Sequence, residues 1–326
     1  MSLRNQHKVV RQGYGGQAVI EGVMIRGPRH ATVVCRRPDG TISRRSRTLQ
    51  KSYTGWASKI PFLRGVIILG ETLHLGMWAL LFSQNVALAE ERSDEDKGMG
   101  VVNALTLLIA FSIAIGIFFL APIFGTRWLV NQIDPDIVAI VLEGVLRLVL
   151  LLGYLLLIGR MGEIKRVFEY HGAEHMTIAT WESDRELKIE NVRQHSRAHP
   201  RCGTSFLLVV AVVAILVFTS LGTPPLWWHL TSRIVFIPVI AAIAYEAIRF
   251  GGTHRHIRLV NWLFAPNLWL QALTTRVPKD DQIEIAIAAM EAAVAQELAD
   301  APAAAETVTA TGAAATGVAP TGQPTG

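Results

Sequence analysis

Four long runs of apolar residues limit the fold of this chain more than any other feature of its sequence. They cover residues 101–124, 137–157, 204–221 and 226–248, and each is close to the roughly 20 residues that a helix needs to cross the bilayer core. The chain is 51% hydrophobic and only 17% charged, which departs from soluble proteins towards membrane proteins. We therefore predict an α-helical polytopic membrane protein with four spans.

The positions of lysine and arginine predict the orientation of these spans, because cytoplasmic loops carry an excess of both residues. The connection after the first run holds only Arg127, and only Arg233 lies near the connection between the third and fourth runs. Residues 1–60 and 160–201 are rich in both residue types. We expect a multi-pass protein of the plasma membrane with both termini in the cytoplasm. Loops beside the lipid bilayer then explain the net charge of +5, and nucleic acid is the less favoured partner.

Residues 61–90 are apolar overall but are interrupted by Arg64, Glu71 and His74. The uncharged part, 75–82, is too short to cross a bilayer. We therefore predict an amphipathic or partly inserted helix. If this segment also crossed, the basic segment 160–201 would be placed outside the cell, against the charge rule.

Residues 1–60 are predicted to form a small basic β-rich unit in the cytoplasm. Pro38-Asp39-Gly40 is a turn signal between two strand-like runs within residues 30–49. Five arginines make the unit strongly basic: Arg36, Arg37, Arg44, Arg45 and Arg47. Such a face suits anionic lipid headgroups or an acidic cytosolic partner, and a solvated basic surface is the alternative.

The rest of the chain divides into five further parts. They are a first transmembrane pair over 101–160, a cytosolic loop rich in histidine over 161–203, a second transmembrane pair over 204–249, a cytosolic C-terminal segment over 250–300, and a tail over 301–326. In the C-terminal segment, Asp280 and Asp281 precede apolar residues spaced by three and four, which is typical of an amphipathic helix. The tail contains Ala, Thr, Pro and Gly without periodicity, so we expect it to be disordered.

The sequence His-Gly-Ala-Glu-His at residues 171–175 is the strongest candidate for chemistry. On a helix, His171 and His175 lie one turn apart on one face, a spacing that lets two imidazoles bind one metal ion. Glu174 could then act as a general base for water, as in the H-x-x-E-H arrangement of one class of zinc proteases. Histidines that are simply buried or that face lipid headgroups are the alternative interpretation.

His199 and Cys202 add two further ligand types just before the third apolar run. Zinc is the divalent metal that we expect with this set. A site in which all four residues bind would be closed and structural, whereas three ligands with Glu174 left uncoordinated would keep an open position for catalysis. A nucleophilic pair of Cys202 with His199 is a weaker alternative. Only two cysteines occur, so we expect no disulfide framework.

Several long peptides of the chain resemble the bacterial YqhQ-like membrane family. They are GGQAVIEGVM at 15–24 with RGP at 26–28, EYHGAEH at 169–175, HPRCGTSF at 199–206, and WLQ at 269–271 with Thr274 and Thr275. The resemblance extends from about residue 12 to 295 and implies a metal-dependent membrane enzyme of unsettled substrate. In the family pattern Lys follows the second histidine and Glu follows Thr-Thr, whereas here Met176 and Arg276 occupy those positions. Neither departure removes a candidate ligand.

Two functional hypotheses follow. The first is a membrane-embedded, metal-dependent hydrolase with Glu174 as general base and Arg201 as a clamp for an oxyanion or phosphate. The second is a non-enzymatic scaffold that recruits an anionic partner through the N-terminal arginines. A transporter is weaker, because the acid–base pairs within the apolar runs are expected to neutralise each other instead of outlining a path. These pairs are Glu143 with Arg147 and Glu246 with Arg249.

Overall fold

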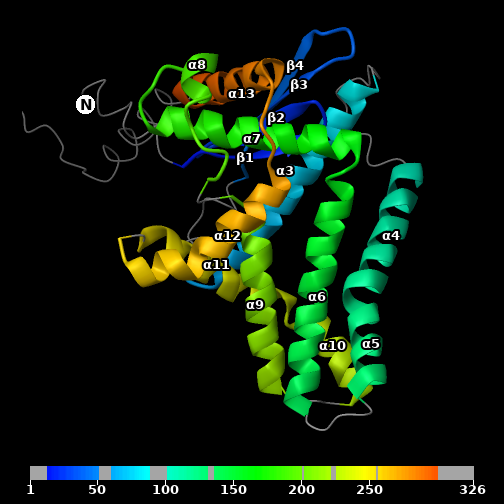
Figure 1. Cartoon of the computed structure of the whole chain (residues 1–326). Coiled ribbons are helices and arrows are strands. Elements are labelled where there is room, and N and C mark those ends of the chain that lie inside the picture. The colour runs from blue at the N-terminus through cyan, green and yellow to red at the C-terminus, as the bar shows by residue number, and fades with distance from the viewer. Residues whose placement is uncertain are drawn as a thin grey trace, which may run out of the picture.

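The structure is a computed structural model that describes residues 13–50, 60–88, 101–130, 136–199, 202–221, 225–254 and 256–299. A small sheet and two of the helices form one end of the molecule, and the long apolar helices extend away from that end (Figure 1). The predicted tail over 301–326 lies outside the described residues.

The four strands at the N-terminal end form one antiparallel sheet in the order β1-β2-β3-β4. Their bounds are β1 Gly15–Val19, β2 Gly22–Arg26, β3 His30–Arg36 and β4 Ile42–Thr48. The turn between β3 and β4 is closed by Asp39, whose Oδ1 accepts hydrogen bonds from the backbone N–H and the hydroxyl of Thr41, and Gly40 has a φ of 86° that favours glycine. The prediction of a small β-rich unit at the N-terminus is confirmed.

Both faces of the sheet are covered, which explains why its central strands are apolar throughout. Val23, Ile25 and Val34 contact a core formed with α7 (Gly162–Glu182) and α13 (Asp280–Ala299). Met24 and Val33 point to the opposite face, where they pack against α3 (Leu63–Ala87). The sheet is therefore a layer between helices, and the short helix α8 (Ile189–Val192) lies beside α7 and α13 (Figure 1).

The remaining helices form the elongated part of the molecule. They are α4 Val101–Ile115, the π-helical turn η2 Gly116–Leu120, α5 Ala121–Val130, α6 Asp136–Ile158, α9 Thr204–Leu221, α10 Leu226–Val235, α11 Ile237–Thr253 and α12 Arg258–Thr274. α9 lies at the centre of this group, packing against α6, α11 and α12.

Among the described residues, three helices are long and apolar enough to cross a membrane by length and composition. They are Leu63–Ala87, Leu105–Thr126 and Ile140–Ile158, and Phe206–Leu221 is a shorter apolar helix. The prediction of four such helices is therefore only partly right. The fourth predicted span, 226–248, is not continuous: it breaks at Phe236 between α10 and α11. Pro238 lies in the first turn of α11, and a proline kinks or breaks the helix that precedes it because it lacks an N–H and its ring clashes with the carbonyl four residues earlier.

The segment that we expected to be only partly inserted forms the continuous 25-residue helix α3. Each of the two charges that argued against it has a partner from a distant part of the chain. Glu71 pairs with Arg26 at 2.9 Å, and Arg64 donates from Nε to Glu246 at 2.7 Å. Paired charges cost much less to place among apolar groups than isolated charges do. Arg64 and Glu71 are therefore compatible with α3 as a candidate membrane-spanning helix.

Candidate metal centre

Helix α7 carries the three residues of the histidine motif, and it is buried although its sequence is polar. The sheet and α13 pack against one side of α7, and segments that join the apolar helices pack against the other. Glu174 and His175 are consequently 3% and 1% exposed, and His171 is half-buried. The polar groups of the motif thus point into the protein and not into solvent.

Backbone carbonyl groups hold both imidazole rings in a defined orientation. Nδ1 of His171 lies 2.8 Å from the carbonyl oxygen of Thr274, and Nδ1 of His175 lies 2.5 Å from that of Arg197. A carbonyl oxygen can only accept a hydrogen bond, so each Nδ1 carries a proton, and in the neutral imidazole Nε2 then keeps its lone pair. This tautomer, fixed by a carbonyl partner, is the one that histidine ligands of metals use.

The two Nε2 atoms converge on Cys202, which lies just before α9. One ligand atom from each of His171, His175 and Cys202 lies within 4.8 Å of the other two. Oε2 of Glu174 completes the cluster, at 3.6 Å from Nε2 of His175 and 4.0 Å from Nε2 of His171. The structure therefore brings four of the six predicted site residues to one point.

The other two predicted residues are placed differently. The ring of His199 lies 5.7 Å from that of His175, but His199 is not part of the converging group, and its Nε2 lies 3.5 Å from a carboxylate oxygen of Glu182. Its backbone is held by Gln271, which accepts from its N–H and donates to its carbonyl oxygen, both at 2.9 Å. Arg201 lies outside the described residues.

A glycine of the motif allows the segment after α12 to approach α7. A side chain at Gly172 would place its Cβ 2.2 Å from the carbonyl oxygen of Arg276. The backbone N–H of Arg276 donates to the carbonyl oxygen of Phe168, also on α7, at 2.8 Å. This close contact brings the nearby carbonyl of Thr274 onto His171, so Gly172 contributes to the orientation of the imidazole.

Two residues of the N-terminal block, Gly16 and Glu21, also belong to the surroundings of the centre, which sequence reasoning missed. A Cβ at Gly16 would lie 2.5 Å from Oε1 of Glu174, so strand β1 packs directly on this carboxylate. The turn after β1 is tied to α7 by Glu21, whose carboxylate accepts hydrogen bonds from Arg166 at 2.6 Å and from the hydroxyl of Tyr170 at 3.3 Å. The only sequence feature that could have indicated a role for these two residues was the Gly-rich block itself.

Burial governs the proton affinity of Glu174. Loss of solvation is the largest effect and raises the pKa of its carboxyl group, whereas a positive charge on protonated His171 or His199 would lower that pKa. A raised pKa makes the carboxylate a better proton acceptor, which suits a general base.

The comparisons with known proteins agree with one another. Residues 60–296 match the family described as "Protein of unknown function (DUF1385)". The chain is also 36% identical over 296 residues to the uncharacterized protein YqhQ of Bacillus subtilis (strain 168), a match that covers 87% of this chain and 92% of that protein. No solved structure matches. The family match includes α7, Cys202 and α12, and it begins after the sheet.

Proposed function

This chain belongs to the DUF1385 family of YqhQ-like proteins, and on that premise we propose that it is a membrane protein that holds a divalent metal ion for hydrolysis. The observation that carries the proposal is the convergence of two oriented imidazoles and one thiol beside a buried carboxylate. A purely structural packing of these residues would not require both Nε2 lone pairs to face the same point.

The chemistry of the donor set fits zinc. His171, His175 and Cys202 offer two nitrogen atoms and one sulfur atom, and three protein ligands are the number that leaves a position for substrate in catalytic zinc sites. A zinc ion held there would polarise a carbonyl or phosphoryl oxygen and increase the acidity of water.

The contribution of the chain itself is to position and move a proton. Oε2 of Glu174 faces the ligand atoms, whereas β1 covers Oε1 at Gly16. Oε2 is therefore the carboxylate oxygen placed to exchange a proton at the ligands, and the raised pKa of Glu174 favours acceptance of that proton. We assign Glu174 as general base, and we assign Arg201 as the oxyanion or phosphate clamp because it adjoins Cys202 in sequence.

We further propose that the centre faces the cytoplasm at the membrane surface. The sheet, α7 and α13 lie together at one end of the long apolar helices (Figure 1), and the Arg-rich segments belong to this end. In this arrangement the plasma membrane is crossed by the helices from α4 to α6, by α9 and by the α10–α11 pair. The end with the sheet then lies in the cytoplasm together with both termini, in agreement with the positive-inside rule.

A docking role is the second candidate, and one observation favours it. Strand β4 is one of the two outer strands of the sheet, and the side chains of Arg44 and Arg45 on it are exposed. Arg36 is partly engaged with Glu284 at 3.2 Å, and Arg47 lies over the ring of Trp78. Two of the five arginines therefore make contacts within the protein. The basic face for anionic headgroups or an acidic partner is smaller than one formed by all five.

Metal analysis of the purified protein, prepared in detergent without chelators, tests the main proposal. We expect about one zinc ion per chain in the wild type and loss of zinc in His171→Ala and His175→Ala, because each removes a ligand. The matched control is His256→Ala, an exposed histidine on the connection before α12, which should keep the metal. Wild-type protein without bound transition metal would contradict the proposal.

Glu174→Gln separates catalysis from structure. The amide preserves the shape of the side chain but cannot accept a proton, so the variant should keep zinc and yet reproduce the phenotype of a gene deletion in the native host. A Glu174→Gln strain that behaves like wild type would show that the centre is structural.

A further inference from the structure

Helix α12 packs against α9 on one side and exposes large apolar side chains on another. The exposed side chains are Leu259, Trp262, Leu263 and Trp269, which are 59% to 74% exposed. They occupy one side of the helix, because intervals of three, four and seven residues return to the same face. A continuous exposed apolar surface of this kind marks contact with a membrane or with another protein.

The connection from α11 to α12 is basic. Residues 247–279 contain four arginines and one lysine but no aspartate or glutamate. Arg249 in the last turns of α11 and Arg258 in the first turn of α12 are both exposed. The nearest preceding carboxylate in the sequence, that of Glu246, accepts a hydrogen bond from Nε of Arg64 at 2.7 Å. Arg258 forms no ion pair with any residue that the structure describes. Since Arg258 precedes Trp262 by one turn, positive charge is exposed at the start of the apolar face.

Local contacts give this connection a defined shape. A Cβ at Gly251 would lie 2.5 Å from the ring of Phe264, so the absence of a side chain lets α11 and α12 pack closely at their junction. The ring of His254 stacks on that of Phe250, with 4.1 Å between the centroids. The two arginines are therefore carried by ordered ends of two packed helices.

The C-terminal end of α12 is fixed beside the candidate metal centre. The carbonyl oxygen of Thr274 lies 2.8 Å from Nδ1 of His171, and the side chain of Gln271 binds the backbone of His199. His199 precedes α9 by a few residues, so this end of α12 lies at the level at which α9 begins (Figure 1). In the orientation proposed above, that level is the cytoplasmic surface of the membrane.

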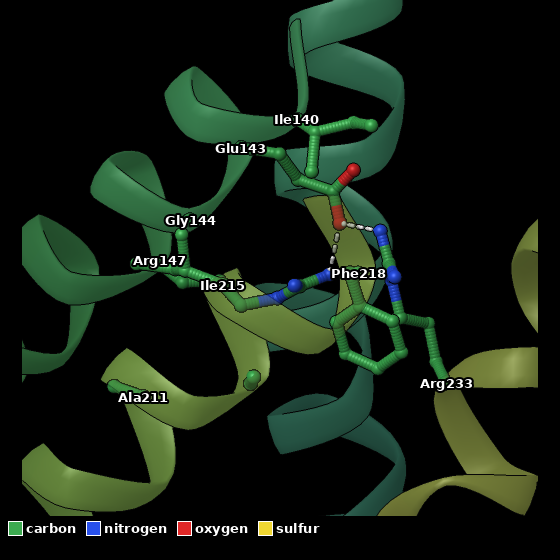
Figure 2. Close-up of a pocket in the computed structure, with 9 residues that line it drawn as sticks. Ile140, Glu143, Gly144, Arg147, Ala211, Ile215, Phe218 and Arg233 are labelled. Carbon is green, nitrogen blue, oxygen red and sulfur yellow. Dashed lines mark hydrogen bonds and ion pairs between the residues drawn. The ribbon is translucent and has the colours of Figure 1, made fainter. Parts of the chain in front are cut away.

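The N-terminal end of α12 is reached from among the apolar helices. Arg233 of α10 lies 2.8 Å from Glu143 of α6, and Figure 2 shows this pair next to side chains of α6 and α9. α11 then leads from α10 to the basic connection, which the positive-inside rule also places at the cytoplasmic surface. α12 has 17 residues and is about 25 Å long. With both ends at one surface, it lies along the membrane and does not cross it.

We propose that α12 lies in the cytoplasmic headgroup layer of the membrane, where Arg249 and Arg258 bind the phosphate of an anionic phospholipid. This inference rests on the proposed orientation of the protein but not on the metal ion. Tryptophan favours the boundary between acyl chains and headgroups, and basic residues at this depth attract anionic lipids. A helix with Trp and Leu on one face and cations beside them is typical of this position. Lipid is favoured over a protein partner because the exposed face lies at the membrane surface, where phospholipid is already present.

Quenching of tryptophan fluorescence by brominated phospholipids tests the position of α12 in the full-length protein. Vesicles of phosphatidylglycerol and phosphatidylcholine would carry bromine either near the headgroup end or near the methyl end of the acyl chains. The difference between wild type and Trp262→Phe isolates the signal of Trp262. We expect at least about twofold stronger quenching of Trp262 by the shallow bromine. Stronger quenching by the deep bromine would place α12 among the acyl chains, and absence of quenching by either would show that another protein chain covers it. Each of these two results would overturn the proposal.

The role of the arginines is tested in mixed vesicles in which only one of the two lipids is brominated. Brominated phosphatidylglycerol should quench Trp262 at least about twofold more than brominated phosphatidylcholine. The double variant Arg249→Gln/Arg258→Gln should lose this preference. The matched control is Arg185→Gln/Lys188→Gln, which removes two exposed cations between α7 and α8 and should keep it. Equal quenching by both lipids in the parent protein, or an unchanged preference in Arg249→Gln/Arg258→Gln, would overturn headgroup binding.

The zinc content of the same preparations separates this inference from the proposed function. Trp262→Phe and Arg249→Gln/Arg258→Gln should keep zinc, because neither changes a converging ligand. A protein without zinc that shows the expected quenching would remove the metal proposal and support lipid binding. A protein that holds zinc but shows no quenching of Trp262 would do the reverse.

Discussion

The sulfur atom of Cys202 lies 3.2 Å from Nε2 of His171. This contact joins the residues just before α9, in the apolar part of the molecule, to the middle of α7 beneath the sheet. The candidate centre is thus at the junction between the two parts of the protein. A metal ion bound there would connect them, so metal binding is expected to stabilise this junction as well as to serve chemistry.

Cys202 and His199 should differ in their effects on metal binding. Cys202→Ala removes a converging ligand, and we expect the affinity for zinc to fall by at least about 100-fold, beyond the usual effect of residues that only support ligands. His199→Gln should leave the stoichiometry unchanged, because the backbone bonds of this residue to Gln271 do not depend on its side chain. Titration with a zinc indicator measures both. Loss of zinc from His199→Gln would instead assign His199 as a ligand.

Gly16→Ala should destabilise the protein, whereas Gly15→Ala, one residue earlier on the same strand, should not. The new methyl group at Gly16 would overlap Oε1 of Glu174, which is buried and has little room to move. The expected loss of stability is about 1–3 kcal/mol, typical of overpacking. A Cβ at Gly15 has no atom within 4 Å. Thermal unfolding followed by tryptophan fluorescence would compare the two variants, and equal midpoints would refute the close packing of β1 on Glu174.

Glu21 should make the attachment of the sheet to α7 sensitive to acid. The hydrogen bond from Arg166 lowers the pKa of this carboxyl group below its ordinary value of 4.5, and Tyr170 acts in the same direction. A group whose pKa is lower in the folded state stabilises the fold above its unfolded pKa and loses that effect as the pH falls through the folded value. Wild type should therefore lose stability below about pH 4.5.

The variant Glu21→Gln cannot undergo this titration and should show a smaller change in unfolding midpoint between pH 6 and pH 4. Arg166→Gln should reduce the same pH dependence, because it removes the first cause of the lowered pKa. An unchanged pH profile in both variants would show that other carboxylates control acid stability.

Reporter fusions would test the orientation of the candidate centre. A C-terminal fusion after Glu190, in α8, should be active as a cytoplasmic reporter, since α7 and α8 lie at the end of the molecule that we place in the cytoplasm. A fusion after Pro224, beyond α9, should report the opposite side of the membrane. An external reporter signal after Glu190 would contradict both the orientation and a cytoplasmic centre.

The sequence by itself determined the features that depend on neighbouring residues. Pro38-Asp39-Gly40 specified the turn between β3 and β4, because Gly40 adopts a positive φ and Asp39 closes the turn. The apolar runs determined a mainly helical chain with helices long enough for a membrane. The spacing of His171 and His175 determined that both would share a helix face. In each case the feature is specified by residues within one continuous segment of the chain.

Only the tertiary structure decided which distant residues meet. Glu71 of α3 pairs with Arg26 of the sheet, and Arg233 of α10 pairs with Glu143 of α6. Cys202 joins the histidines, whereas His199 is turned towards Glu182. These outcomes depend on how helices pack across separations of up to 90 residues, which no local pattern records. Charge and spacing identified the candidates, and packing chose among them.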